Sequence, residues 1–364
     1  MRVLFITPGG MDEPCSRVRA LQYFPGLALE GIEPHAHALL SDAGWHRIIR
    51  STRLTGVVLA RVYSERINSI ARLLTESKNL ESYAAVVILR TLLPKFVQSL
   101  LLQKNDRLIY DFDDAVWLPP PAMRSNILRK LLLPSRAGSF HRLLSASRAV
   151  ITASPILADY AGKFNANVSL IYSSVDTQRV VPRGGAADAG LVTIGWMGTP
   201  SNLSYVDAMS EALNHVCAKF PNVRIRLVGG PPNALGVHGQ FEVAEWSLDR
   251  EVVDLQSFDI GIMPVPDDPV ARAKGGYKLF QYMAVGIPCV ASPIGINSDI
   301  VQHGKTGFLA STPEEWESSL HALVADPKLR REMGHAGRDR VQEYYSAAAM
   351  LPRLVNVIKA VATS

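Results

Sequence analysis

Short apolar runs rich in β-branched residues alternate with longer helical patterns along the chain, and the alternation starts again after a break near residue 185. This order is typical of parallel α/β sheets, because two parallel strands need a crossover connection, which is usually a helix. Two such series predict an α/β protein with two Rossmann-like domains that face each other across a cleft. Open sheets of this kind bind ligands beyond the carboxyl ends of their strands, so we expect the chemistry there.

The expected elements fall into two series of similar size. In the first half we expect strands at 3–7, 84–89, 107–110, 149–152 and 168–171, and helices at 16–29, 61–74, 127–145 and 155–163. In the second half we expect strands at 192–196, 223–228, 241–243, 260–263 and 289–291, and helices at 204–219, 248–256, 277–285, 313–325 and 327–344. The small, polar stretch 181–190 predicts a linker. We therefore expect domains at 1–182 and 183–344, with a helix at about 345–364 that packs back on the first domain.

Composition narrows the class of protein. The chain has 364 residues, of which 48% are hydrophobic and 20% are charged, and this much apolar side chain excludes intrinsic disorder. Its three cysteines are far apart and odd in number, which predicts neither a zinc site nor a disulfide framework and suggests a reducing compartment. The first apolar run is too short for a signal peptide, and the apolar stretch 83–102 contains Arg90, Pro94 and Lys95. We expect a cytoplasmic protein without a membrane span.

Charge is distributed unevenly between the two halves. Residues 1–180 hold 22 Lys and Arg against 14 Asp and Glu, a net +8, and the remainder holds 16 against 19, a net −3, which together give the net +5 of the chain. The basic half suggests an anionic partner, either the inner face of a membrane or a phosphate-bearing acceptor. The alternative interpretation is a solvated basic face without such a partner. Nucleic acid is not expected, because aromatic residues are not interleaved with the basic ones. The arginines that could attract a membrane are Arg47, Arg50, Arg53, Arg61, Arg66 and Arg72.

The most informative segment runs from residue 258 to residue 309. It reads as a strand, an acidic proline-rich loop, a Lys-Gly-Gly turn, a helix and a second strand. Gly275 and Gly276 allow the backbone to approach a ligand closely, and the start of the following helix favours an anion. With Lys274 before the turn and Lys278 after it, this region predicts a diphosphate clamp, the alternative being a surface helix with solvated lysines.

This segment resembles the donor-binding region of retaining GT-B glycosyltransferases, the large family 4 and its relatives. "QYMAVGIPCVASPIG" matches the second half of a family motif in which two glutamates, separated by seven intervening residues, bind the nucleotide sugar. Here Gln281 stands at the second glutamate and Ala273 at the first, so that only Gln281 could still bind ribose hydroxyls. The resemblance implies a GT-B fold with an acceptor-binding domain at 1–182 and a donor-binding domain at 183–344.

Two turns in the second half are further candidates for donor binding. The family usually has a glycine-rich turn followed by a basic pair where this chain has Gly198 and Thr199, which are followed by no basic residue before Lys219. Such a turn offers backbone N–H groups and hydroxyls to phosphate, or it is an ordinary strand-to-helix turn. Gly230 lies where the resemblance places contacts to the nucleotide base.

An acidic cluster follows an expected strand in the first half. Asp111, Asp113 and Asp114 crowd three carboxylates into four residues, so they need a basic partner, a metal or a raised pKa. If the cluster were a metal-binding Asp-x-Asp motif, it would suggest a GT-A glycosyltransferase, but the second Rossmann-like half argues against that fold. If it held the nucleophile of a phosphatase, the motif would require Thr or Val where this chain has Ala115. The sequence resembles one found in a bacterial subgroup of the family, which implies that Asp113 or Asp114 touches the acceptor hydroxyl. A helix-capping role for one of the three stays open.

The N-terminal turn supplies candidates for acceptor binding. Gly9 and Gly10 follow the first expected strand, and Ser16, Arg17 and Arg19 open the next helix. Two arginines at a helix start can hold a phosphate or a carboxylate, or both can be plain surface residues.

Together these features predict transfer of a sugar from a nucleoside-diphosphate donor to an acceptor hydroxyl, with retention of configuration. Lys278, Asp113 and Asp114 are the expected catalytic residues. We expect no cofactor and no metal, and a saccharide or lipid-linked acceptor, as in the synthesis of cell-surface polysaccharide or glycolipid. The alternatives are a catalytically silent nucleotide-sugar-binding subunit, which Ala273 keeps open, and a nucleotide-sugar epimerase of the same fold.

Overall fold

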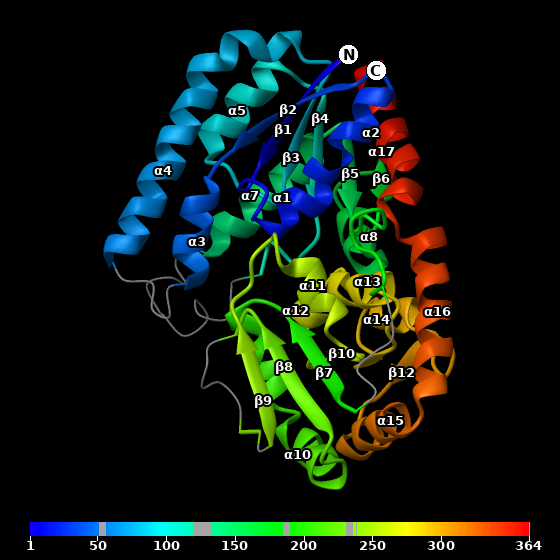
Figure 1. The fold of residues 1–364 in the computed structure, drawn as a ribbon. Coiled ribbons are helices and arrows are strands. Elements are labelled where there is room, and N and C mark those ends of the chain that lie inside the picture. Colours follow the sequence, from blue (N-terminus) through cyan, green and yellow to red (C-terminus); the bar gives the residue numbers. More distant parts are fainter. Residues whose placement is uncertain (51–55, 119–132, 185–189, 231–235, 238, 364) are drawn as a thin grey trace. The chain divides into compact units, whose positions relative to one another are not determined.

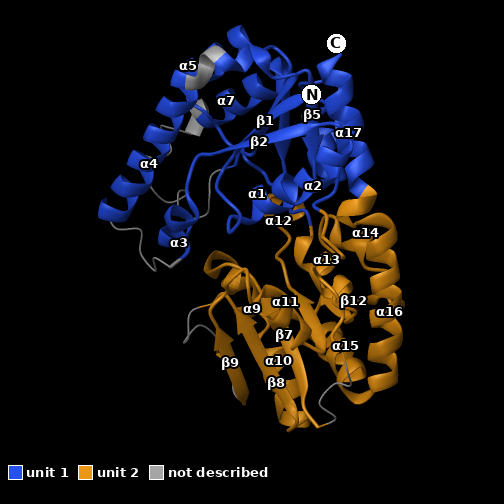
Figure 2. Ribbon diagram, turned by 45° about the horizontal axis from the view of Figure 1, so that its top comes forward, with its two compact units in different colours: residues 1–173, 273–275, 350–364 blue, residues 174–272, 276–349 orange. Residues whose placement is uncertain are grey.

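The computed structural model describes residues 1–50, 56–118, 133–184, 190–230, 236–237 and 239–363. The expected linker at 181–190 and the expected helix at 127–145 each fall partly outside these residues, and Arg53 falls wholly outside them. The chain forms two compact units, drawn in two colours in Figure 2. Unit 1 comprises 1–173, 273–275 and 350–364, and unit 2 comprises 174–272 and 276–349.

Unit 1 is built on a six-stranded parallel sheet in the order β2-β1-β3-β4-β5-β6 (Figure 1). Its strands are β1 (Arg2–Thr7), β2 (Glu33–Ala38), β3 (Ala85–Leu89), β4 (Leu108–Phe112), β5 (Ala149–Thr152) and β6 (Val168–Leu170). Its helices are α1 (Pro14–Arg19), η1 (Leu21–Tyr23), α2 (Phe24–Leu29), α3 (Asp42–Arg50), α4 (Gly56–Thr75), η2 (Glu76–Ser82), α5 (Lys95–Lys104), α7 (Leu133–Ala146) and α8 (Pro155–Ala161). The central strands β3, β4 and β5 are wholly buried, as expected for a parallel sheet covered on both faces.

Unit 2 repeats this plan with a sheet in the order β12-β11-β10-β7-β8-β9, again parallel throughout. Its strands are β7 (Val192–Met197), β8 (Val223–Val228), β9 (Gln240–Ala244), β10 (Ile260–Met263), β11 (Cys289–Ala291) and β12 (Gly307–Leu309). Its helices are η4 (Pro200–Asn202), α9 (Leu203–Asp207), α10 (Ser210–Lys219), α11 (Glu251–Gln256), α12 (Pro269–Arg272), α13 (Tyr277–Ala284), α14 (Asn297–Ile300), α15 (Pro313–Ala325) and α16 (Pro327–Tyr344). Two Rossmann-like sheets are thus confirmed.

The last helix, α17 (Ala347–Ala362), contributes residues 350–362 to unit 1. It packs closely on α2, because a Cβ atom added to Gly26 would lie 2.5 Å from a methyl carbon of Leu351. At its end Lys359 pairs with Glu30, with 3.3 Å between nitrogen and oxygen.

The expected helices at 16–29 and 204–219 are each broken. The first becomes α1, η1 and α2, and Pro25 stands in the first turn of α2, where its missing N–H group is tolerated, whereas inside one long helix it would break a hydrogen bond. The second becomes α9 and α10, separated at Ala208 and Met209.

Candidate functional site

The predicted turn at Gly198 lies at the carboxyl ends of two central strands of unit 2. The N–H of Gly198, directly after β7, donates to the carbonyl of Val228 at the end of β8 across 3.0 Å. Gly229 follows with a φ of 90°, a region that favours glycine, and a Cβ atom there would lie 2.1 Å from the Gly198 carbonyl oxygen. The two turns therefore approach each other so closely that Gly229 admits no side chain.

Lys278 lies beside the Gly198 turn. It stands in the first turn of α13, which begins after Gly276, a residue with a φ of 69°. The Lys278 ammonium nitrogen is 5.6 Å from the centroid of the buried Trp196 ring, within the range of a cation–π contact. A Cβ atom on Gly198 would approach Lys278 Cε to 2.9 Å. The structure thus brings together Gly198 and Lys278, two residues that the sequence predicts for donor binding.

The other predicted residues of the turns have local partners. Thr199 Oγ1 lies 3.0 Å from Ser201 Oγ and accepts from Asn202 Nδ2 at 3.2 Å, so its hydroxyl helps to order η4. A Cβ atom on Gly230 would lie 3.6 Å from a Leu203 methyl carbon, an ordinary contact. Their contact with a donor stays a prediction.

The Lys-Gly-Gly turn is divided between the units. Ala273, Lys274 and Gly275 group with unit 1, whereas Gly276 and the helix after it belong to unit 2. Ala273 is 1% exposed within the apolar core of unit 1, so a glutamate at this position would carry its charge into an apolar cluster. The joint action of Lys274 and Lys278 on one diphosphate stays a prediction.

Gln281 is hydrogen-bonded to Glu251, a residue that the sequence did not predict for the site. It is 4% exposed, and its Nε2 donates across 3.2 Å to Oε1 of Glu251, which is 2% exposed. Glu251 also forms an ion pair with Arg179. Burial lowers the pKa of Arg179, but Glu251 outweighs it and raises that pKa above its usual value. No local sequence signal links these residues, because they come from three distant segments.

In unit 1 the acidic cluster finds basic partners. Asp111, near the end of β4, accepts from Arg19 Nε at 2.9 Å and from Arg19 Nη2 at 2.7 Å, and both side chains are at most 3% exposed. Arg19 Nη1 donates to the carbonyl of Ile171 at 2.6 Å. Arg19 is therefore a buried partner of Asp111, and its predicted contact with an acceptor is not part of this geometry.

Arg90 holds the two carboxylates that follow. Its guanidinium lies 3.6 Å from Asp113 Oδ1 and 3.2 Å from Asp114 Oδ2, and its side chain is 40% exposed. Its φ of 47° is unusual for a residue with a side chain, and its N–H donates to the Asp111 carbonyl at 2.7 Å. Strained backbone of this kind concentrates at functional sites. Sequence reasoning missed Arg90, although its place directly after the apolar run of β3 was a usable signal.

The predicted acceptor turn is ordered by internal bonds. The Gly9 N–H donates to Ser16 Oγ at 3.0 Å, and Ser16 Oγ donates to Glu13 Oε2 at 2.6 Å. Gly10 lies against Asp42, whose oxygen would be 2.5 Å from an added Cβ atom. Arg17 is 4% exposed and donates to the carbonyl of Met11 at 2.8 Å. Acceptor binding by this turn stays a prediction.

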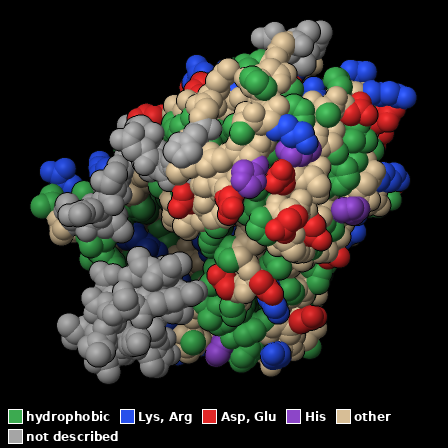
Figure 3. Space-filling view, turned by 90° about the horizontal axis from the view of Figure 1, so that it is seen from below, with side chains coloured by type: hydrophobic (Ala, Val, Ile, Leu, Met, Phe, Trp, Pro, Cys, Tyr) green, Lys and Arg blue, Asp and Glu red, His purple; other side chains and the backbone are tan. Residues whose placement is uncertain are grey.

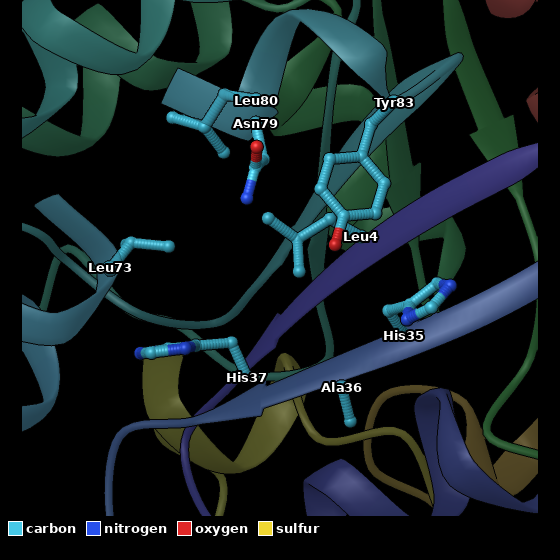
Figure 4. A pocket seen from close by; sticks show the side chains of 8 residues that line it. All are labelled: Leu4, His35, Ala36, His37, Leu73, Asn79, Leu80 and Tyr83. Atoms are coloured by element: carbon cyan, nitrogen blue, oxygen red, sulfur yellow. The ribbon is translucent and has the colours of Figure 1, made fainter. Parts of the chain in front are cut away.

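A cavity of about 190 Å³ lies elsewhere in unit 1, between β1, β2, α4 and η2 (Figure 4). Its lining consists of Leu4, His35, Ala36, His37, Leu73, Asn79, Leu80 and Tyr83. His37 is bonded to the carbonyl of Ser69 at 3.0 Å. None of the predicted site residues lines this cavity.

Within the described part of the chain, no three His, Cys, Asp or Glu side chains come together in a way that could hold a metal ion. None of its helices has the length and apolar character needed to cross a bilayer.

Solved structures with the same architecture define the class of fold. A glycosyltransferase from Rickettsia africae has a TM-score of 0.69 at 14% identity, with 99% of this chain and 98% of that chain covered. The Anabaena protein Alr3699/HepE, solved in complex with UDP and glucose, has a TM-score of 0.66 at 14% identity, with 99% and 100% covered. The chain has the GT-B fold of glycosyltransferases, with two parallel-strand Rossmann-like sheets and their helices.

Sequence relatives point to a family within this class. Residues 189–326 match the family described as Glycosyl transferases group 1. A GDP-Man:Man(3)GlcNAc(2)-PP-Dol alpha-1,2-mannosyltransferase of Dictyostelium discoideum is 25% identical over 237 residues, which are 57% of this chain and 45% of that protein. The chain thus spans less than half the length of this relative. These matches support a place for the chain in group 1, and they favour neither the silent subunit nor the epimerase.

Proposed function

We propose that this protein transfers a sugar from a nucleoside-diphosphate donor to an acceptor hydroxyl, with retention of configuration and without a bound metal. The group 1 match over residues 189–326 supports the transferase activity, and the resemblance to retaining enzymes supports retention. The acceptor class that fits the basic first half is a saccharide or lipid-linked sugar at the inner face of a membrane.

The observation that carries the proposal is the cluster of Gly198, Gly229 and Lys278 at the carboxyl ends of β7 and β8. In this reaction negative charge builds on the leaving diphosphate as the glycosidic bond lengthens. A fixed ammonium group and backbone N–H groups stabilise that charge without reorganising, and such stabilisation is usually the largest catalytic contribution. Lys278 would supply the ammonium group, and its own helix start adds favourable partial charge.

On the acceptor side, Asp113 and Asp114 are the candidates for contact with the reacting hydroxyl. Both are partly exposed, at 19% and 29%, and Arg90 fixes both carboxylates. An acceptor hydroxyl that donates to such a carboxylate would be oriented for attack on the sugar. Asp111 is too deeply buried for this contact and instead ties β4 to α1 through Arg19.

The experiment is a transfer assay with purified protein, labelled nucleoside-diphosphate sugars and a membrane extract. We expect labelled saccharide or lipid-linked product, and about a hundredfold lower turnover in Lys278→Ala. Lys328→Ala, on a side chain that is 76% exposed in α16, is the matched control and should keep wild-type turnover.

Other outcomes would contradict the proposal in distinct ways. Donor binding without transfer would indicate a silent binding subunit, and donor isomerisation would indicate an epimerase. Unchanged turnover in Lys278→Ala would remove Lys278 from the diphosphate site even if transfer were observed.

A further inference from the structure

The cavity between β1, β2, α4 and η2 interrupts the apolar core of unit 1. In the parallel pairing of the two strands His35 lies beside Leu4, and His37 lies beside Ile6. Leu4 and Ile6 both belong to this core. Neighbours across a parallel pair present their side chains on the same face of a sheet, so two imidazoles stand where apolar side chains would continue the core. Exceptions of this kind to the rule of an apolar core are expected at functional sites.

Three buried leucines form the apolar part of the cavity lining. Leu4, Leu73 and Leu80 are 6%, 2% and 2% exposed. The cavity volume of about 190 Å³ exceeds the roughly 150 Å³ of an engineered apolar cavity that binds benzene. Asn79, also in the lining, is exposed, and the His35 side chain is 35% exposed, so the cavity is open to solvent beside these residues. A ligand with one ring and a small substituent can therefore enter without unfolding the unit.

Contacts outside the cavity orient its two histidines. His37 Nε2 lies 3.0 Å from the carbonyl oxygen of Ser69. His35 Nε2 lies 2.9 Å from Oε1 of Glu33. Because a carbonyl or carboxylate oxygen only accepts, each Nε2 carries the hydrogen, and the Nδ1 of the neutral ring is left as an acceptor. The lining thus offers two imidazole acceptors in fixed orientations.

Tyr83 and Asn79 add hydrogen-bond donors to the lining. In Figure 4 the hydroxyl of Tyr83 and the amide of Asn79 point toward the middle of the cavity. The Arg2 guanidinium carbon lies 4.8 Å from the centroid of the Tyr83 ring, and the His35 ring meets the same ring edge-on at 5.6 Å. Within the described chain no hydrogen bond occupies the Asn79 side chain, although its backbone carbonyl accepts from Ser82 Oγ at 2.6 Å. Donors that are held in place in this way bind a ligand at a lower cost in entropy.

The lining differs in charge from the ordinary surface of the molecule. On the face drawn in Figure 3, Lys, Arg, Asp and Glu side chains lie among apolar ones. Among the described residues that line the cavity, none is of these four types. An ionic ligand would lose its water without gaining an opposite charge, and a saccharide would bury hydroxyls against leucines. The lining therefore fits a neutral ring with few polar atoms.

We propose that this cavity is a binding site for a neutral single-ring carboxamide or lactam. The ring packs against the three leucines, its carbonyl accepts from Asn79 and Tyr83, and its N–H donates to the Nδ1 of His37. The site uses none of the residues assigned to sugar transfer, so it goes beyond the proposed function and stands without it.

The test is methyl NMR of the full chain with small probes. Benzamide supplies a neutral ring, one carbonyl and N–H donors, and it should shift the methyl resonances of Leu4, Leu73 and Leu80. We expect a dissociation constant of about 1 mM or lower, a range open to a ligand of so few atoms. Benzoate has the same shape with a negative charge, and it should bind at least about tenfold more weakly. Glucose should leave these resonances in place.

Variants of the polar groups test the assigned contacts. Asn79→Ala and Tyr83→Phe should each weaken benzamide about fivefold, the factor that one ordinary hydrogen bond supplies. Leu80→Phe fills part of the cavity and should abolish binding. The matched controls are Tyr63→Phe, on a side chain that is 57% exposed in α4, and Asn222→Ala, on an exposed residue of unit 2, and both should bind like wild type.

Several results would overturn the proposal. Benzamide that shifts none of the three leucines at up to about 10 mM would show that the cavity binds no such ring. Benzoate or glucose binding as tightly as benzamide would remove the preference for a neutral amide. Wild-type affinity in both Asn79→Ala and Tyr83→Phe would show that these groups do not recognise the ligand, even if Leu80→Phe failed to fold. None of these outcomes bears on Lys278 or on sugar transfer.

Discussion

At the scale of single residues, burial and the neighbouring Arg19 shift the pKa of Asp111 in opposite directions. Burial raises the pKa of Asp111 to about 6 from an ordinary 3.8, although Arg19 beside it acts in the opposite direction. The folded state then holds this proton more tightly than the unfolded state does. Its contribution to stability is complete below about pH 4 and is lost as the pH rises through 6.

The prediction compares wild type with Asp111→Asn, which cannot titrate. The free energy of unfolding of wild type minus that of the variant should fall by about 2 kcal/mol between pH 4 and pH 6, the larger part of the roughly 3 kcal/mol that a pKa difference of two units gives over the whole pH range. Urea unfolding at a series of pH values measures it. A difference that grows with pH would mean that Arg19 dominates over burial.

Asp106→Asn is the control with the opposite sign. The hydrogen bond from Arg148 lowers the pKa of Asp106, so its contribution to stability should rise with pH in the acid range. The effect should be small, because the Asp106 side chain is 63% exposed and solvent screens the pair.

At the scale of elements, the sequence predicts best where periodicity and end signals agree. The expected ranges for β8, β10, β11, α15 and α16 match the structure residue for residue. Both helices have strong start signals, with Thr312 and Glu315 forming a capping box before α15 and Asp326 capping α16. Local signals of this kind can be read without knowing the fold.

Strand β2 escaped prediction for a physical reason. Its sequence, EPHAHA, contains a proline and two histidines and has little β propensity. It is an edge strand paired only with β1, and an edge tolerates a proline that a central strand would not. In the candidate site, too, some residues could not be predicted from the sequence. Gly198 and Lys278 could be proposed from motifs, whereas Glu251 and Arg90 act through contacts that only the folded chain creates.

The Gly198–Gly229 contact yields a prediction about the turn as an element. In Gly229→Ala the new Cβ atom would meet the Gly198 carbonyl at 2.1 Å, so the turn must move in addition to accepting an unfavourable φ. We expect about 2–3 kcal/mol of destabilisation and weaker donor binding. Gly304→Ala separates the two effects, because Gly304 has a φ of 75° with open space around it and should lose only about 1 kcal/mol. Equal losses of stability in both variants would show that the close approach of Gly229 to the Gly198 carbonyl does not add to the cost of the substitution.

At the scale of the whole molecule, two compact units with separate apolar cores predict two thermal transitions. Asp111→Asn should shift the transition of unit 1 and Gly229→Ala that of unit 2, which assigns each transition to its unit.

A donor that contacts Gly198 and Lys278 binds folded unit 2 and therefore raises the melting temperature of the transition that belongs to unit 2. At a hundred times its dissociation constant, such a ligand adds about 2.7 kcal/mol by mass action. Scanning calorimetry of the full chain with a panel of nucleoside-diphosphate sugars should find one that shifts this transition, and Lys278→Ala should reduce the shift while Lys328→Ala should not. If no nucleotide sugar moves either transition, or if the shift is as large in Lys278→Ala, the diphosphate site does not lie at the ends of β7 and β8. Because this measurement needs no acceptor, it tests donor binding separately from transfer.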